Sequence, residues 1–370
     1  MGHLTEQKRA TNKIAATKPP GQEVEGDMQA SIPSAGRQVP AIENVTPDVF
    51  AALRAQGKPA VFKGLARHWT LVEQAKLSDQ AAVEYLKGCD NGRPTEVWLG
   101  DPAIKGEFFF GHTLDELNFH RFSASLSPTL DHLCDLKGQE NPPALFIQSM
   151  SVADHLPSLL PPDAMSLLPG VSPRIWIGNR TRVQTHYDPV ENIACLAAGR
   201  RRFTLFAPDQ LKNLYIGPLY KTIAGAPTSL ASLENPDFER FPRLREALAN
   251  AWYADLEPGD ALYIPYFWWH HVQSLTPFNI LVNYWWDDAA GEHADAMDAF
   301  INALLSVRSL SSGKRAIWAN MFAHYVLETD GDAAAHIDVS DRGILGPLSD
   351  EEASTMKQQL LARLIARWKA

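Results

Sequence analysis

The chain has 370 residues, with 43 acidic and 34 basic side chains, a formal net charge of −9 and a pI of about 5.7. Nucleic-acid phosphates attract Lys and Arg, so this acidic balance argues against a general nucleic-acid binder. Apolar residues make up 45% and charged residues 21% of the chain, which is typical of a soluble globular protein with one large domain plus additions.

Three cysteines, Cys89, Cys134 and Cys195, are widely separated and odd in number, which indicates neither a disulfide framework nor a zinc site. Free thiols suit a reducing compartment. The sequence has no apolar run of membrane-spanning length, and its N-terminus lacks the apolar core of a signal peptide. We therefore expect a cytoplasmic protein with no membrane association.

The N-terminal part of the chain divides at about residue 38. Residues 1–38 are polar, with little apolar periodicity, and predict a flexible arm. Thr46 and Pro47 then have the residue types of an N-cap and a first helical position. Up to residue 148 the pattern predicts helices over residues 47–56, 69–76, 78–87, 113–119 and 126–136, and strands over residues 59–64, 96–99, 108–110 and 145–148.

Short strands separated by turns dominate the central region. They are expected over residues 174–178, 193–197, 200–206, 263–272 and 279–286, with a long insertion over residues 213–250. Repeated short antiparallel strands predict a mainly β protein built on a barrel or jelly roll.

The last eighty residues change to helical periodicity, over residues 296–305, 316–327 and from Ser349 onward. Ser349 and Glu352 have the spacing of a capping box. The last helix places one apolar stripe on its surface, made of Met356, Leu360, Leu361, Leu364, Ile365 and Trp368. This stripe either packs on the protein's own barrel or forms a homodimer contact.

His186 and Asp188 are two residues apart in a predicted strand, so they share one face, and Tyr187 points away. Two imidazoles and a carboxylate form a facial triad with open coordination positions, which suits non-haem Fe(II) and oxygen chemistry. The second imidazole comes from the Trp-Trp-His-His run near residue 270. His270 and His271 alternate between faces, so only one of them can join the triad.

Arg201 shares a strand face with Phe203 and Leu205, whereas Arg200 and Arg202 share the other face. An arginine that points into a barrel needs an anionic partner, and a guanidinium binds a carboxylate as a fork. The alternative is a partly exposed arginine in a solvated patch of three.

These motifs resemble those of the JmjC-domain, cupin-like oxygenases that depend on Fe(II) and 2-oxoglutarate. The resemblance covers roughly residues 40–290. Within that group the motifs are most similar to the asparaginyl hydroxylases acting on hypoxia-inducible factor and to related bacterial cupin-like proteins. The resemblance depends on the following motifs: His186-Tyr187-Asp188, Asn192, Gly199, Arg201, Asn235 to Pro242, Pro258-Gly259-Asp260 and Trp268 to His271.

The resemblance implies a double-stranded β-helix, in a domain over residues 39–290. The helical periodicity described above predicts a C-terminal helical region over residues 291–370. The resemblance also implies a role for nine residues: His186, Asp188 and His270 as iron ligands, and Arg201, Asn192, Asn283, Gln148, Trp285 and Phe146 around the cosubstrate. Two positions depart from the family pattern. Arg201 stands where the family usually has Lys, and Phe146 stands where it often has Tyr.

The activity that the resemblance implies is hydroxylation of a C–H bond, coupled to conversion of 2-oxoglutarate and molecular oxygen into succinate and carbon dioxide. The substrate is left open among a protein side chain, a peptide and a small molecule. Two other functions are compatible with the sequence: a metal-binding cupin that needs no cosubstrate, and a catalytically silent JmjC-like binding module. We also expect a homodimer formed through the C-terminal helices.

Overall fold

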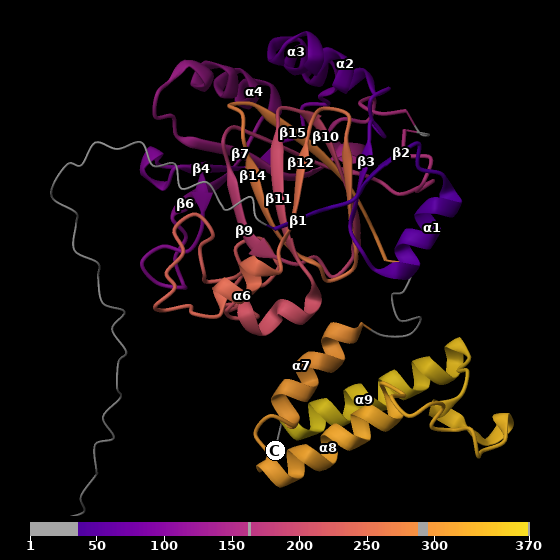
Figure 1. The fold of residues 1–370 in the computed structure, drawn as a ribbon. Coiled ribbons are helices and arrows are strands. Elements are labelled where there is room, and N and C mark those ends of the chain that lie inside the picture. Colours follow the sequence, from indigo (N-terminus) through magenta and orange to yellow (C-terminus); the bar gives the residue numbers. More distant parts are fainter. Residues whose placement is uncertain (1–35, 162–163, 288–294, 369–370) are drawn as a thin grey trace, which may run out of the picture.

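The computed structural model describes residues 36–161, 164–287 and 295–368 (Figure 1). Two β-sheets lie face to face and form a barrel, so the predicted mainly β jelly roll is confirmed. The smaller sheet has, in spatial order, β1 (Arg37–Gln38), β12 (Trp252–Leu256), β11 (Arg201–Phe206), β14 (Trp269–Ser274), β9 (Arg182–His186) and β5 (Glu107–Phe108).

The larger sheet extends beyond the barrel on both sides. Its spatial order is β2 (Ala41–Glu43), β3 (Ala60–Lys63), β13 (Ala261–Ile264), β10 (Glu191–Ala198), β15 (Asn279–Trp286), β8 (Arg174–Gly178), β7 (Ala144–Ser151), β4 (Thr95–Gly100) and β6 (Phe119–Ala124). The pairs from β13 to β6 are antiparallel.

The barrel interior is one apolar cluster between the two sheets. Phe203 and Leu205 of β11 and Val272 of β14 belong to it, together with Phe146 and Leu281 from the larger sheet. These positions alternate along their strands, because every second side chain of a strand points to the same face.

Helices cover the outer face of the larger sheet: α1 (Pro47–Gln56), α2 (Thr70–Leu77), α3 (Asp79–Cys89) and α4 (Leu126–Asp135), with the short α5 (Val152–His155) after β7. The start of α1 is as predicted, because the Thr46 side chain accepts a hydrogen bond from the Val49 N–H and Pro47 is the first helical residue. Apolar residues of α2 to α4, such as Leu71, pack with Ile193 and other residues on the outer face of the sheet.

Residues 213–250, which include α6 (Leu244–Ala249), cover the outer face of the smaller sheet. Leu214 and Leu244 belong to the same apolar cluster as Phe206 and Trp269, the outward-facing residues of β11 and β14. These parts of the predicted insertion bury the back of the strands whose front faces the barrel, whereas Ile223 belongs to the cluster of the barrel interior.

Two local predictions are wrong. Residues 113–119 form turns leading into β6, not a helix. The side chain of Asn118 accepts from the Phe109 N–H and donates to the Glu107 carbonyl, and these tertiary hydrogen bonds outweigh local helix propensity. The strand predicted over residues 263–272 is two strands in different sheets, β13 and β14, because Pro265 cannot donate to the ladder and a turn follows it.

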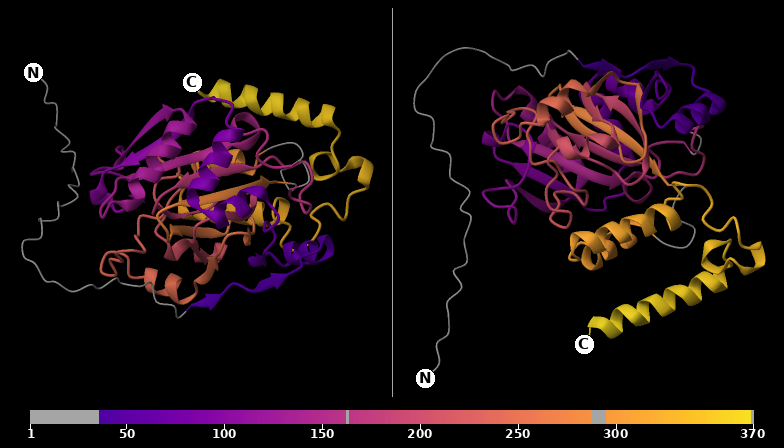
Figure 2. Two further views of the ribbon diagram at one scale, coloured as in Figure 1. Left: turned by 90° about the horizontal axis from the view of Figure 1, so that it is seen from above. Right: turned by 60° about the horizontal axis from the view of Figure 1, so that its bottom comes forward.

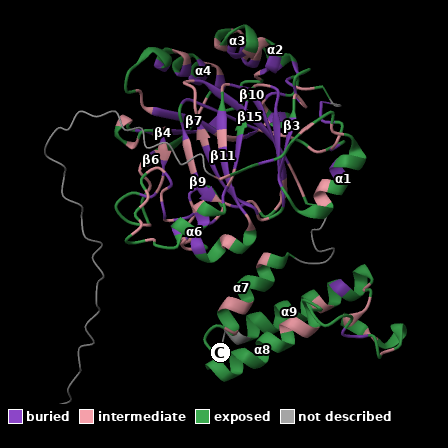
Figure 3. Cartoon of the chain, in the orientation of Figure 1, coloured by how far each residue is buried: buried purple, intermediate pink, exposed green. Residues whose placement is uncertain are grey.

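The C-terminal helices α7 (Ala296–Ser306), α8 (Ser312–Tyr325) and α9 (Asp350–Trp368) lie beyond one end of the barrel (Figures 1 and 2). The capping box is present, since the Glu352 N–H donates to Ser349 Oγ and the Ser349 N–H to Glu352 Oε2. Most of this region is exposed, in contrast to the buried barrel strands (Figure 3).

The ends of the predicted regions fall partly outside the described residues. Of the predicted arm, residues 1–35 lie outside them, whereas Arg37 and Gln38 form β1, which pairs with β12. The predicted boundary near residue 290 also lies outside them. None of the described helices combines the length and apolar character that a membrane span requires. The cytoplasmic location stays a prediction.

Candidate metal centre

His186 and His270 are cross-strand partners on β9 and β14. Asp188 follows β9 after the strand has ended, yet it reaches the same space, with its Oδ2 3.6 Å from His270 Nε2. One possible ligand atom from each of the three residues lies within 4.8 Å of those from the other two. Within the described part of the chain, this is the one group of three or more His, Cys, Asp or Glu residues that could hold a metal ion.

Both imidazoles are oriented by a backbone carbonyl. His186 Nδ1 lies 2.8 Å from the Gln184 carbonyl oxygen, and His270 Nδ1 lies 3.0 Å from that of Trp268. A carbonyl only accepts, so Nδ1 carries the proton and Nε2 keeps its lone pair for a metal. Burial, and then the neighbouring His186, lowers the pKa of His270 to about 4, which keeps this imidazole neutral, as a metal ligand must be.

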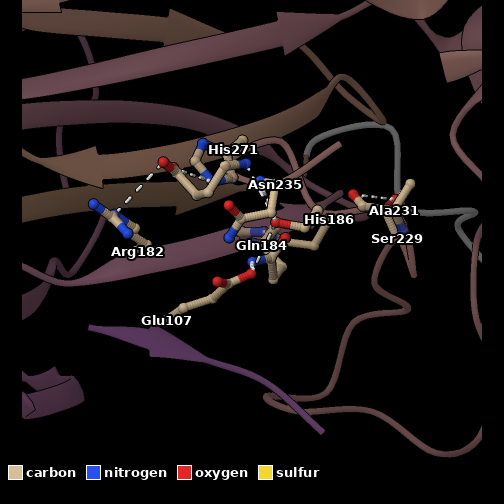
Figure 4. Close-up of polar contacts among 10 residues, drawn as sticks. Glu107, Arg182, Gln184, His186, Ser229, Ala231, Asn235 and His271 are labelled. Carbon is tan, nitrogen blue, oxygen red and sulfur yellow. Dashed lines mark hydrogen bonds and ion pairs between the residues drawn. The ribbon is translucent and has the colours of Figure 1, made fainter. Parts of the chain in front are cut away.

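His271 does not share this space. Its side chain points to the opposite side of β14, where its Nε2 lies 3.5 Å from Glu234 Oε1 in the insertion (Figure 4). Tyr187 also points away from the metal ligands, and its ring stacks on Phe267 with centroids 4.4 Å apart. Strand alternation left open whether His270 or His271 joins His186 and Asp188. In the structure His270 lies beside them.

Arg201 lies in the same cavity as the three candidate ligands. Its side chain is buried, and neither Nε nor Nη2 makes a hydrogen bond. Burial lowers its pKa to about 9. Arg202, in contrast, forms a fork with Asp255 at 2.7 and 2.8 Å, and Arg200 is exposed. The predicted alternation of this strand is confirmed, and the patch of three exposed arginines is excluded.

This cavity, with a volume of about 100 Å³, collects every residue that the sequence selected. Its wall includes His186, Asp188, His270, Arg201, Asn192, Asn283, Gln148, Trp285 and Phe146. The buried Oδ1 atoms of Asn192 and Asn283 make no hydrogen bond. Other wall residues are apolar and include Phe203, Val272 and Leu281. The cavity therefore offers one cation, two amide oxygens without a hydrogen bond and a candidate metal centre, beside apolar side chains.

Sequence reasoning missed several wall residues. Gln184 lies two residues before His186, and strand alternation could have selected it. Its buried Nε2 donates to Glu107 Oε1, which also accepts from the Ser232 hydroxyl at 3.1 Å (Figure 4). Ile223, Ala224, Ala226 and Thr228 come from the insertion, where no motif marks them.

The fold and the site define a jelly-roll protein with a candidate mononuclear metal centre inside its barrel. A family model described as the cupin-like domain matches residues 46–292 of the 370, and the chain belongs to this family. The JmjC proteins of this family include oxygenases that use Fe(II) and 2-oxoglutarate.

Three curated relatives illustrate the similarity. Lysine-specific demethylase JMJ31 of Arabidopsis thaliana is 35% identical over 125 residues, which cover 34% of this chain and 22% of the relative. JmjC domain-containing protein D of Dictyostelium discoideum is 27% identical over 242 residues, covering 60% of this chain and 50% of the relative. tRNA wybutosine-synthesizing protein 5 of Gallus gallus is 33% identical over 118 residues, covering 32% and 34%. The chain thus spans half or less of the length of each of these relatives.

Proposed function

We propose that this protein is an Fe(II)- and 2-oxoglutarate-dependent oxygenase that hydroxylates a C–H bond of a protein side chain or a small molecule. One observation carries the proposal: the unpaired, buried guanidinium of Arg201 shares one cavity with His186, Asp188 and His270.

The three candidate ligands fit a non-haem Fe(II) ion. They are two imidazoles and one carboxylate, the set that leaves coordination positions free on one side of the metal. The hydrogen bonds from Nδ1 of both histidines to carbonyl oxygens leave both Nε2 atoms available. His186, Asp188 and His270 would hold the ion.

Arg201 fits the far carboxylate of 2-oxoglutarate. A buried guanidinium without a partner is costly, and a carboxylate would satisfy both unpaired nitrogens as a fork. The buried amide oxygens of Asn192 and Asn283 make no hydrogen bond and would accept one from water or from a bound ligand. When bound together, iron and 2-oxoglutarate supply the oxidising chemistry; the chain supplies position and enclosure.

The unpaired Arg201 beside the candidate ligands gives less support to the two other functions that the sequence left open. A cupin that needs no cosubstrate has no use for an isolated cation in its metal cavity. A silent binding module has no need of a complete set of three candidate ligands with oriented imidazoles.

The test is turnover by the purified 370-residue chain. With Fe(II), oxygen and 2-oxoglutarate, we expect succinate to form, and a cell extract that contains the substrate should accelerate it. Asp188→Ala should abolish succinate formation. An iron-loaded protein that neither binds nor consumes 2-oxoglutarate would reject this function in favour of the cosubstrate-independent cupin.

We also propose that the C-terminal helices form a homodimer. Leu305 is 77% exposed, and Leu360 and Leu361 are 53% and 57% exposed, so the stripe predicted on the last helix is not covered by the barrel. The side chain of Trp368, the last residue of that stripe, lies outside the described residues. An apolar surface of this extent is unusual in a monomer and is typical of an interface. A second copy of the same helices would cover it symmetrically.

A further inference from the structure

A second and larger cavity, of about 530 Å³, adjoins the candidate metal cavity. The two cavities share three wall residues: Trp98 of β4, Gln148 of β7 and Ala224 of the insertion. We call the larger cavity the outer cleft. Its wall includes Glu96, Trp98, Arg121, Gln148, Ser149 and Arg174. Because of the shared walls, a molecule in the outer cleft lies next to the metal cavity, and the size is that of a ligand site.

Two arginines of the outer cleft lie one strand away from the metal cavity. Arg121 on β6 is the cross-strand partner of Trp98, and its guanidinium lies 4.8 Å from the centroid of the Trp98 ring. Arg174 on β8 is the cross-strand partner of Asn283. Antiparallel partners are about 5 Å apart, so each arginine is the direct neighbour of a residue that lines the metal cavity.

Arg174 is held in place but keeps donors free. Its Nε donates to Ser149 Oγ at 2.6 Å, and its Nη2 donates to the Ser149 carbonyl. These bonds support Ser149 in the left-handed region, at φ 47°, within an irregular stretch of β7. A guanidinium has five N–H donors, so most of those of Arg174 are available to a ligand.

The charges of the two arginines are not neutralised by the carboxylates of the cleft. Within the described residues, neither Arg121 nor Arg174 forms an ion pair. Glu96 accepts from the indole N–H of Trp98 at 2.6 Å, and Asp154 lies 4.0 Å from Arg93 at the exposed rim. The cleft thus carries both signs of charge, with two arginine guanidiniums free of ion pairs on its wall beside the metal cavity.

We propose that the outer cleft binds the substrate, and that Arg121 and Arg174 bind an anionic group of that substrate, a carboxylate or a phosphate, close to the carbon that is oxidised. The inference rests on the proposed function, because it takes the metal cavity as the place of oxidation. It narrows the substrate class to molecules with an acidic group near the reacting carbon.

The experiment uses the whole 370-residue chain with Fe(II) and saturating 2-oxoglutarate, without oxygen. The probes are hexapeptide libraries with randomised flanks and a fixed central Asp, phosphoserine or Lys, and adenosine monophosphate as a non-peptide phosphate. At least one anionic probe should bind about tenfold or more tightly than the Lys library, the effect expected of a charge-assisted hydrogen bond. The Asp arm reports a carboxylate, and the phosphoserine and nucleotide arms report a phosphate.

Arg121→Glu should remove this preference or reverse it toward Lys. Arg245→Glu is the matched control. Arg245 is also exposed and also lies over an aromatic ring, 4.0 Å from the centroid of Phe238. It belongs to α6 and is not part of the wall of the outer cleft. Arg174→Lys keeps the charge and should weaken anion binding less than Arg121→Glu. Binding of iron and 2-oxoglutarate is measured on the same samples, so a failure of the proposed function shows separately. Equal binding of all probes, or an anion preference that survives Arg121→Glu, would overturn the inference.

Discussion

His186 and His270 face each other across two paired strands, with ring centroids 4.2 Å apart. Because both residues belong to one sheet, their separation is set by strand pairing. Asp188 is different, since it follows β9 and its place depends on the turn after the strand. The candidate centre thus combines two ligand positions fixed by the sheet with one fixed by a loop.

The three candidate ligands should be required for metal binding and dispensable for folding. We expect His186→Ala or Asp188→Ala to abolish iron binding, measured by metal content after anaerobic loading, with little change in the circular dichroism spectrum. His271→Gln is the control, because His271 points to the other side of β14 and should leave the metal content unchanged. Loss of iron in His271→Gln with retention in Asp188→Ala would reverse the assignment.

Arg201→Met should stabilise the protein without ligands and remove its response to 2-oxoglutarate. The substitution replaces a buried, unpaired charge by an apolar side chain, which we expect to raise the free energy of unfolding by about 1–4 kcal/mol. The iron-loaded parent should gain about 2.7 kcal/mol at a cosubstrate concentration of about 100 times Kd, whereas the variant should gain nothing.

Arg202→Met provides the comparison for this denaturation experiment. Arg202 makes a partly exposed fork with Asp255, so its loss should change stability by less than about 1 kcal/mol and keep the response to 2-oxoglutarate. If Arg202→Met loses the response and Arg201→Met keeps it, the cosubstrate lies elsewhere.

Glu234 should give stability a pH dependence. Burial raises the pKa of this carboxyl, the Arg182 guanidinium opposes the shift, and the Glu107 carboxylate adds to it. A carboxyl whose pKa is raised by folding contributes stability that is present below its unfolded pKa of about 4.3 and is lost as pH rises through the folded pKa. Glu234→Gln should therefore gain in melting temperature relative to the parent as the pH rises above the unfolded pKa. A difference that is constant with pH would contradict this.

The C-terminal helices should hold two copies together. Light scattering of the intact protein should give twice the chain mass of 41.0 kDa. Leu360→Glu combined with Leu364→Glu should give a monomer, since both side chains are exposed on α9, and Leu211→Glu, 54% exposed on the barrel domain, should not. A monomeric parent protein rejects the dimer.

The site was predictable where it depends on strand alternation and on motifs. Arg201 is buried and Arg202 partly exposed because alternate residues of a strand face opposite sides, and this needs only the sequence and the start of the strand. The same rule places His270 and His271 on opposite sides of β14. Gln184 was within reach of this rule as well.

The features of the fold and of the candidate site that the sequence did not predict depend on contacts between distant segments. The wall residues Ile223 and Ala224 are brought to the cavity by the path of the insertion, which has no periodic pattern. The turn at Pro265 carries the chain from one sheet to the other, although the residues on both sides of it are typical of a single strand. The Asn118 side chain likewise replaces a predicted helix by tertiary hydrogen bonds.

The central claim is that one cavity holds iron at the triad and 2-oxoglutarate on Arg201. Crystals grown anaerobically with Fe(II) and 2-oxoglutarate, with diffraction recorded on both sides of the iron absorption edge, test it most directly. We predict an anomalous peak enclosed by His186, Asp188 and His270, and a carboxylate of the ligand on the Arg201 guanidinium. An iron peak at another place, or a 2-oxoglutarate molecule without contact to Arg201, would contradict the claim.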